Sequence, residues 1–161
     1  MISVVRNPGA RALSEYNYAR NGHRKKWLFQ RFDAGLVAKA AHKYNFEGYL
    51  DFLREHKNVY GNIACKFLGI EDTRNIATHF AAHVFHIGRL EDLGSFVQGL
   101  RAKTGTPVNF PHLNKTASKA ATSFGSSESR KLEDLYAQDF ELYHWLSRAE
   151  SRMAERSARR A

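Results

Sequence analysis

The chain has 161 residues, a length that fits a single domain with a substantial buried core. Hydrophobic residues make up 43% and charged residues 25%, and the 11 Phe, 7 Tyr and 2 Trp exclude a wholly disordered chain. The sequence contains no run of about 18 apolar residues, which excludes a transmembrane helix. The 25 basic and 16 acidic residues give a formal net charge of +9, which indicates an anionic partner.

The cysteine content bears on the cellular compartment. Cys65 is the only cysteine, so an internal disulfide bond and a zinc site built from cysteines are both excluded. The first residues do not have the apolar segment of a secretory signal peptide. We therefore expect a cytoplasmic protein.

The N-terminal segment predicts a strand, a turn and a helix in that order. Residues 2–5 are rich in β-branched side chains, which is typical of a short buried strand. Asn7 can cap the following helix, and Pro8 is favoured at the first helical position. The helix should end near Asn21 and Gly22.

The middle of the chain predicts several helices and a second strand. Asn45 is placed to cap a helix over 46–56, whose apolar residues share one face. Gly88 should stop the second strand. Gly105 should end the helix that follows this strand. The spacing of apolar residues predicts further helices over 58–68, 72–83 and 90–103, and a strand over 84–87.

The C-terminal part predicts a polar loop over 106–125 and a last long helix from about Ser127. The apolar stripe of this helix consists of Leu132, Leu135, Tyr136, Phe140, Tyr143 and Leu146. Beyond Ser147 the stripe ends and arginines dominate, so we expect the end of the helix to fray. The predicted organisation is one domain over 1–146 followed by a basic tail over 147–161.

Two strands that are each followed by a helix predict a helix-rich α/β fold with a parallel sheet. Two strands are fewer than a parallel sheet with both faces covered normally contains. We therefore expect a partial sheet flanked by many helices.

The most informative residues follow the first strand. Arg6 comes at its carboxyl end, where open α/β sheets bind ligands, and the next helix directs its positive dipole end toward the same place. Arg6 can donate two hydrogen bonds to a phosphate, and Ser14 can add a hydroxyl from the helix beside Arg11. The alternative is that Arg6 pairs with a carboxylate and that Ser14 faces solvent.

The order of strand, Arg6-Asn7-Pro8, helix and Ser14 resembles the 3′-phosphate motif of sulfotransferases that use 3′-phosphoadenosine-5′-phosphosulfate (PAPS). In that family a serine follows the arginine by eight residues, as Ser14 follows Arg6 here. Other segments resemble the family in the same order along the chain, namely 46–50, 62–68, 84–93, 112–116 and 134–143. The resemblance covers residues 2–146.

The resemblance implies a P-loop-kinase-like sheet and transfer of a sulfuryl group from PAPS to a hydroxyl or amine. The acceptor would be a carbohydrate or another small hydroxyl compound, and the product 3′-phosphoadenosine-5′-phosphate. The nucleotide ligands that it implies are Arg6, Ser14, Asn114, Lys115 and Thr116. Lys119 is a weaker candidate, and both lysines have the alternative of being solvated loop residues. No metal is implied, and no catalytic base can be assigned.

The chain departs from the family pattern ahead of Arg6, where the family has a strand and a glycine-rich loop that hold the 5′-phosphosulfate. The segment 103–106 has similar letters, but it follows a predicted helix and is interpreted as a helix C-terminus. The missing strand would lie beside 2–5, and one expected position is between 2–5 and 84–87. The chain thus resembles the C-terminal two-thirds of an enzyme, and a truncated, non-catalytic protein that binds a nucleotide or polyanion is the alternative function.

Histidines and acidic residues elsewhere favour structural roles. His79 and His83 have the spacing of two metal ligands on a helix, with His86 on the next strand, but a structural or surface role is the simpler interpretation. Glu91 and Asp92 are interpreted as favourable charges at a helix N-terminus. Three histidines are candidate bases by residue type alone, and a surface role is simpler for each: His23, His42 and His56.

Basic segments leave a third function open, which is binding of nucleic acid through its phosphates. The stretch 20–31 and the tail are rich in arginine and lysine, but no zinc finger, RNA-recognition motif or basic zipper is present. Binding of nucleic acid is therefore the weakest of the three candidate functions. In a sulfotransferase-like protein, Arg24, Lys25 and Lys26 would instead meet an anionic acceptor.

Overall fold

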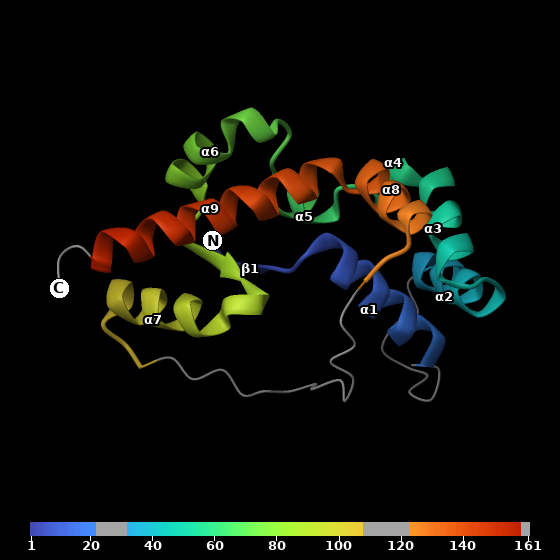
Figure 1. Cartoon of the computed structure of the whole chain (residues 1–161), viewed down its shortest axis with the longest axis horizontal. Coiled ribbons are helices and arrows are strands. Elements are labelled where there is room, and N and C mark those ends of the chain that lie inside the picture. The colour runs from blue at the N-terminus through green and yellow to red at the C-terminus, as the bar shows by residue number, and fades with distance from the viewer. Residues whose placement is uncertain (22–31, 108–122, 159–161) are drawn as a thin grey trace. The chain divides into compact units, whose positions relative to one another are not determined.

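The computed structural model describes residues 1–21, 32–107 and 123–158 (Figure 1). The chain divides into two compact units, each assembled from segments that are distant in sequence. The sheet unit comprises Met1–Asn7, Ala64–Thr122 and Gln138–Ala161. The helical unit comprises Pro8–Ile63 and Ser123–Ala137. Within the described ranges, no helix combines the length and the apolar character needed to cross a membrane.

The sheet unit is built around two short parallel strands, β1 (Ile2–Val5) and β2 (His86–Arg89). The register pairs Ile2 with His86 and Val5 with Arg89, so both strands end at the same edge. Its helices are α5 (Ile63–Leu68), η2 (Thr73–Asn75), α6 (Ile76–His83), η3 (Leu90–Asp92), α7 (Leu93–Thr104) and α9 (Ala137–Ala158). The predicted helix-rich α/β fold with a parallel sheet is thus present at this coarse level.

The second strand differs from its prediction in both bounds. It begins at His86 rather than at residue 84, and Gly88 lies inside it instead of stopping it. A Cβ atom added to Gly88 would lie 2.8 Å from Cδ2 of Phe96 on α7. Glycine is therefore present because a helix packs closely against the strand, a long-range cause that the local pattern does not show.

The strands also correct one expectation about a missing strand. The expectation of a strand between the first and second strands is wrong for this chain, because β1 and β2 pair directly with each other. The backbone ladder continues before the strands, where the Phe85 N–H donates to the Met1 carbonyl at 2.8 Å.

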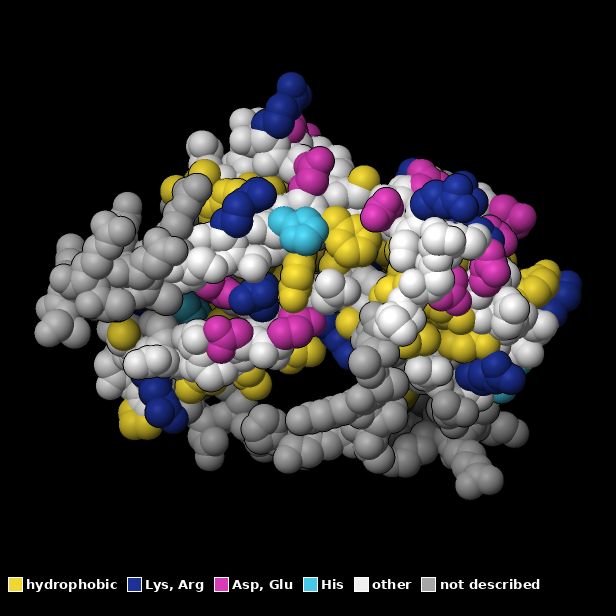
Figure 2. Space-filling view, viewed as in Figure 1, with side chains coloured by type: hydrophobic (Ala, Val, Ile, Leu, Met, Phe, Trp, Pro, Cys, Tyr) yellow, Lys and Arg dark blue, Asp and Glu magenta, His cyan; other side chains and the backbone are white. Residues whose placement is uncertain are grey.

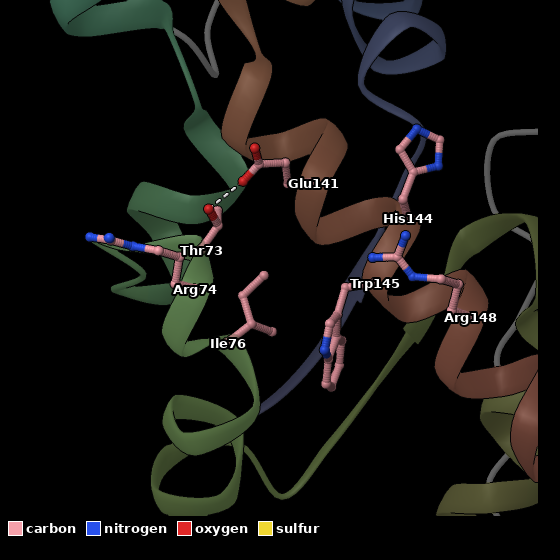
Figure 3. A pocket seen from close by; sticks show the side chains of 7 residues that line it. All are labelled: Thr73, Arg74, Ile76, Glu141, His144, Trp145 and Arg148. Carbon is pink, nitrogen blue, oxygen red and sulfur yellow. Dashed lines mark hydrogen bonds between the residues drawn. The ribbon is translucent and has the colours of Figure 1, made fainter.

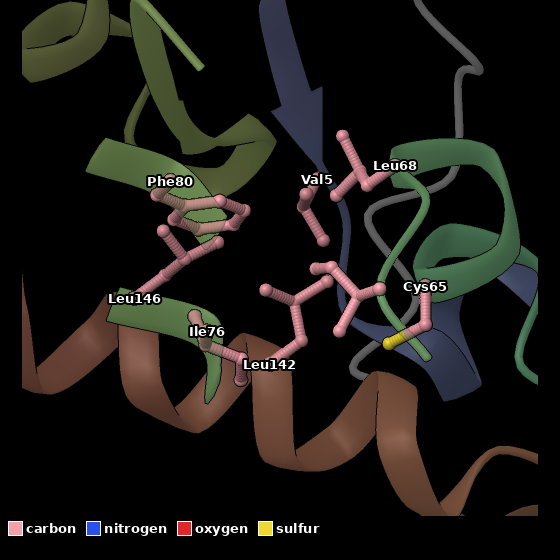
Figure 4. Packing of buried hydrophobic residues seen from close by; sticks show 8 residues of the cluster. Val5, Cys65, Leu68, Ile76, Phe80, Leu142 and Leu146 are labelled. Atoms are coloured by element: carbon pink, nitrogen blue, oxygen red, sulfur yellow. The ribbon is translucent and has the colours of Figure 1, made fainter. Parts of the chain in front are cut away.

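A cluster of apolar side chains lies between the sheet and the helices of this unit (Figure 4). Its buried members are Val5, Cys65, Leu68, Ile70, Ile76, Phe80, Leu142 and Leu146. Leu142 and Leu146 come from consecutive turns of α9, so one face of that helix closes the core. Burial of each such leucine stabilises the fold by about 1.5–3 kcal/mol.

Asp139 is the one buried charged side chain among the described residues, and it is fully inaccessible. Its carboxylate accepts the backbone N–H groups of Ala64 at 3.1 Å and Cys65 at 2.9 Å. These groups belong to the first turn of α5, which has no helical partner for them. Asp139 therefore caps α5 from a position about 75 residues later in the chain.

The helical unit contains α1 (Pro8–Asn21), α2 (Phe32–Lys43), α3 (Phe46–Glu55), α4 (Lys57–Tyr60) and α8 (Ser126–Leu135). The predicted bounds of α1 are confirmed. The cap of α3 is confirmed too, because the Asn45 side chain accepts the Gly48 N–H at 2.9 Å. Helix α2 is not among the predicted helices, and the helix predicted over 58–68 is instead two short helices, α4 and α5. Asn62 separates them with a positive φ of 47°.

The last long helix is likewise two helices, α8 and α9, which are interrupted at Tyr136. The Tyr136 side chain is fully buried, so the apolar stripe runs through the interruption and conceals it in the sequence. Helix α9 continues to Ala158, beyond the point where fraying is predicted. Glu150, in that extension, forms an ion pair with Arg89 of the sheet.

The helical unit combines a core of large side chains with ion pairs on its surface. Tyr49, Leu50 and Leu53 of α3 are buried, as are Leu132 and Leu135 of α8. The ion pairs of this unit involve Asp134 with Arg54 and Lys57, and Lys131 with Asp51 and Glu47. Figure 2 shows acidic and basic side chains next to one another over α3 and α8.

Candidate functional site

The carboxyl edge of the two-stranded sheet carries the residues that point to a ligand. Arg6 follows β1 directly, as predicted, and its side chain is half-buried. Within the ranges that the structure describes, Arg6 makes no hydrogen bond or ion pair. Its guanidinium is therefore available to an anion, because none of the described carboxylates pairs with it.

A hydrogen-bonded network occupies the remainder of this edge. Arg89, at the end of β2, donates from Nε to Glu150 at 2.6 Å, and its guanidinium carbon lies 5.6 Å from the centre of the Tyr143 ring. The Glu91 carboxylate is near enough to Tyr143 to raise the pKa of its hydroxyl, and Glu91 Oε1 accepts the backbone N–H of Asn7 at 2.9 Å. The network thus links the ends of both strands to α9.

The electrostatics of the network keep Tyr143 a donor. Burial, and next the adjacent Glu91 carboxylate, raise the pKa of the Tyr143 hydroxyl, while Arg89 opposes them. Arg89 is matched by Glu150, with both side chains at most one-quarter exposed. Arg6 is therefore the cation at this edge that has no described counter-charge.

The acidic pair before α7 divides between two roles. Asp92 accepts the Ser95 N–H at 3.2 Å and caps α7, as the sequence predicts for a helix N-terminus. Hydrogen bonds from the Ser95 side chain and backbone lower the pKa of the Asp92 carboxyl. Glu91 has a role that the sequence does not indicate. Its carboxylate accepts the backbone N–H of Asn7, just after β1.

The second predicted phosphate ligand, Ser14, lies in α1 of the helical unit and is half-buried. Arg11 lies on the same helix, and its guanidinium carbon is 4.7 Å from the centre of the Tyr136 ring. The structure describes Arg6 and Ser14 in separate units, so their pairing stays a prediction from the sequence.

The remaining predicted ligands fall outside the described residues. They are Asn114, Lys115 and Thr116, together with the weaker candidate Lys119. His23 and the basic residues Arg24, Lys25 and Lys26 are outside them as well.

The segment 103–106 has the predicted structural role. Helix α7 ends at Thr104, and Gly105 adopts a left-handed conformation with φ of 66°. Its N–H donates to the Arg101 carbonyl at 2.9 Å, which is a common way for a helix to end. The similarity of these letters to a phosphate-binding loop therefore has no structural counterpart.

Two of the three histidines considered for metal binding contact backbone carbonyls, and the ring of the third, His83, lies 4.9 Å from that of His79. His79 lies 2.8 Å from the Leu68 carbonyl, and His86 lies 2.8 Å from the Phe96 carbonyl and stacks on the Phe96 ring. No cluster of three or more His, Cys, Asp or Glu side chains suited to a metal occurs in the part of the chain that the structure describes. Of the candidate bases, His42 and His56 are both exposed.

The sequence analysis missed Arg89, Tyr143 and Glu150 as residues of this edge. Arg89 and Glu150 are 61 positions apart, and Tyr143 belongs to an apolar stripe that predicts only core packing. The one available signal was the position of Arg89 after a predicted strand, which is the same reasoning that identified Arg6.

Comparison with known proteins adds no family to these observations. No protein-family model matches the chain, and neither a curated protein nor a solved structure does. The interpretation of the site therefore depends on its chemistry, which is a half-buried arginine beside a balanced network at the carboxyl edge of a parallel sheet.

Proposed function

We propose that the protein is a sulfotransferase-like protein that binds the 3′-phosphate of PAPS through Arg6. The single observation that carries this proposal is the half-buried Arg6 side chain at the carboxyl end of β1, without a partner among the described residues. A guanidinium can donate two parallel hydrogen bonds to a phosphate. The order of strand, Arg-Asn-Pro and helix also agrees with the motif of that family.

The donors at this edge fit one phosphate group. Glu91 already accepts the Asn7 N–H, so the proposal assigns the phosphate to the Arg6 guanidinium and not to that backbone group. Ser14 would add a hydroxyl, and Lys115 with Asn114 and Thr116 would close over the nucleotide. These four roles come from the family resemblance alone.

The proposed reaction is transfer of the sulfuryl group of PAPS to a hydroxyl or amine of an acceptor such as a carbohydrate. The fold would then correspond to part of a P-loop-kinase-like sheet. For the 5′-phosphosulfate, the described residues offer no glycine-rich loop after a strand, because the segment 103–106 ends a helix. Non-catalytic binding of the nucleotide or of a polyanion is therefore the second candidate function.

Calorimetric titration with 3′-phosphoadenosine-5′-phosphate tests the proposal. We expect saturable binding, a loss of at least about tenfold in affinity for Arg6→Ala, and a smaller loss for Ser14→Ala. Arg101→Ala, which removes an exposed arginine of α7, is the matched control and should leave the affinity unchanged. Absence of binding, or equal binding by Arg6→Ala, would reject the proposed site.

Glu91→Gln sharpens the test because it predicts a gain. Glutamine keeps an oxygen that can accept the Asn7 N–H. It removes the negative charge of Glu91, which is bound to the residue next to Arg6. We expect tighter nucleotide binding by a few-fold, and this gain should shrink at high salt. A loss of affinity would show that the nucleotide does not bind beside Glu91.

Activity and salt dependence separate the candidate functions. Transfer of sulfate from PAPS to an added acceptor supports the enzyme, whereas nucleotide binding without transfer supports the non-catalytic protein. Binding of nucleic acid with a steep fall in affinity as salt rises, and without competition by the nucleotide, would favour the nucleic-acid function instead.

A further inference from the structure

A surface cavity of about 290 Å³ lies within the sheet unit, between η2, α6 and α9 (Figure 3). Its lining residues are Thr73, Arg74, Ile76, Glu141, His144, Trp145 and Arg148. The indole of Trp145 is partly buried and fixed by Phe80, with ring centres 5.3 Å apart at an angle of 78°. The cavity therefore has a rigid apolar wall, to which Ile76 adds its buried side chain.

The polar groups of the cavity differ in whether they are already engaged. Arg74 is paired with Asp72 at 2.7 Å, and Figure 3 shows its guanidinium extending away from the other labelled side chains. Arg148 makes no hydrogen bond or ion pair with any residue that the structure describes, and its guanidinium extends toward Trp145. Among the described lining residues, Arg148 is thus the arginine without a described counter-charge.

The opposite end of the cavity carries a fixed acceptor. Glu141 accepts a hydrogen bond from the Thr73 hydroxyl, which holds its carboxylate against η2. Glu141, Trp145 and Arg148 lie on one face of α9, at positions i, i+4 and i+7. Seven residues correspond to about 10 Å along a helix, so Glu141 and Arg148 lie on either side of the Trp145 indole.

This arrangement specifies a ligand with two different ends. Arg148 can bind an anionic group, and a carboxylate matches the guanidinium geometry. Glu141 would repel a second anion, but it can accept a hydrogen bond from an amine or hydroxyl. Between them, the flat wall of Trp145 and Ile76 favours a planar apolar ring. The volume of the cavity suits a molecule of that size.

We propose that this cavity binds a planar ring that carries a carboxylate at one end and an amino or hydroxyl group at the other. The site is separate from the carboxyl edge of the sheet, and it requires neither the nucleotide nor sulfuryl transfer. An aminobenzoate is the simplest compound of this class.

Nuclear magnetic resonance on the full chain gives a direct test. In a Trp27→Phe background, Trp145 is the sole tryptophan, so its indole N–H gives one resolved signal. We expect 4-aminobenzoate to shift this signal saturably. Arg148→Gln should weaken binding about tenfold, and Arg101→Gln, an exposed arginine on α7, should not.

Glu141→Gln tests the second end of the ligand. It should weaken 4-aminobenzoate by about fivefold, yet leave benzoate, which has no amine, bound as well or better. Both substituted residues are exposed, and unchanged remaining signals would show that the variants fold. No saturable shift, or equal binding by Arg148→Gln, would overturn the proposal.

A cross-test keeps this proposal distinct from the nucleotide site. Arg6→Ala should bind 4-aminobenzoate normally, and Arg148→Gln should bind 3′-phosphoadenosine-5′-phosphate normally. If Arg6→Ala abolished both, the two ligands would share one site and the cavity assignment would be wrong.

Discussion

One buried polar side chain in each unit shows a contrast in whether its hydrogen bonds are satisfied. In the sheet unit, the fully buried Asp139 carboxylate accepts two backbone N–H groups of α5. In the helical unit, the Tyr49 hydroxyl is buried and finds no hydrogen-bond partner among the described residues. Burial also raises the pKa of Glu15 on α1, with Arg11 opposing the shift.

This difference predicts which substitutions lower or raise the stability of each unit. A matched buried charge stabilises the sheet unit, and losing its acceptor would leave two N–H groups unsatisfied. The Tyr49 hydroxyl of the helical unit, which has no hydrogen-bond partner among the described residues, costs stability instead, so removing it should help.

Asp139→Ala should destabilise the protein by about 4 kcal/mol, because two charge-assisted hydrogen bonds to α5 are lost. Asp139→Asn keeps one carbonyl oxygen as an acceptor and should lose about half as much. Urea unfolding followed by Trp145 fluorescence in the Trp27→Phe background measures both. A loss below about 1 kcal/mol for Asp139→Ala would mean that water replaces the carboxylate and that the cap is not a source of stability.

Tyr49→Phe should change stability in the opposite direction. Removing a buried hydroxyl without a described partner should stabilise the protein by about 1 kcal/mol, since the ring that fills the core is kept. Burial, and then the nearby Glu15 carboxylate, raise the pKa of Tyr49, so the hydroxyl is protonated and its loss removes no charge. Tyr18→Phe, at a side chain that is 64% exposed, is the control and should have no effect in urea unfolding.

Glu15→Gln should alter how stability depends on pH. Because the folded protein holds the pKa of Glu15 above its usual value, protonated Glu15 favours folding at low pH, and this contribution is lost as pH rises through the folded pKa. The variant should therefore gain stability relative to the wild type between pH 4 and pH 7. Urea unfolding at both pH values, with exposed Glu55→Gln as the control, measures the difference. An unchanged difference would mean that Glu15 is solvated.

Asp134→Asn should have the smallest effect and the opposite dependence on pH. Lys57 and Arg54 lower the pKa of Asp134, so its contribution exists above the usual carboxyl pKa and is lost as pH falls through the folded value. The three side chains are more than two-fifths exposed, so solvent screening should keep the loss at neutral pH below about 1 kcal/mol. Glu133→Gln on the same helix is the matched control. A larger loss in urea unfolding would show that these ion pairs act as a network.

Elements with strong local signals could be predicted from the sequence. Pro8 begins α1, Asn45 caps α3 and Gly105 ends α7, because each of these effects depends on a residue and its near neighbours. Helix α2 was missed, since the apolar residues of its sequence are mostly small and Gly35 interrupts them. The interruption at Tyr136 was missed because the apolar stripe continues across it.

The candidate site divides in the same manner. The position of Arg6 could be predicted, because a residue that follows a strand lies at the edge of the sheet whatever its partners are. The network of Arg89, Tyr143, Glu91 and Glu150 could not, since hydrogen bonds between residues 61 and 84 positions apart leave no periodic pattern. The same applies to the cavity beside Trp145, which unites η2, α6 and α9.

The helical character of the chain, the strand that precedes Arg6 and the helix caps follow from the sequence alone, because local backbone preferences and apolar spacing act over a few residues. Only the tertiary structure decided that β1 pairs directly with β2, that Asp139 caps a distant helix and that Arg6 remains without a described partner. The physical reason is that pairing and burial depend on which segments meet after the chain has folded, and a partner's distance along the sequence does not predict that meeting.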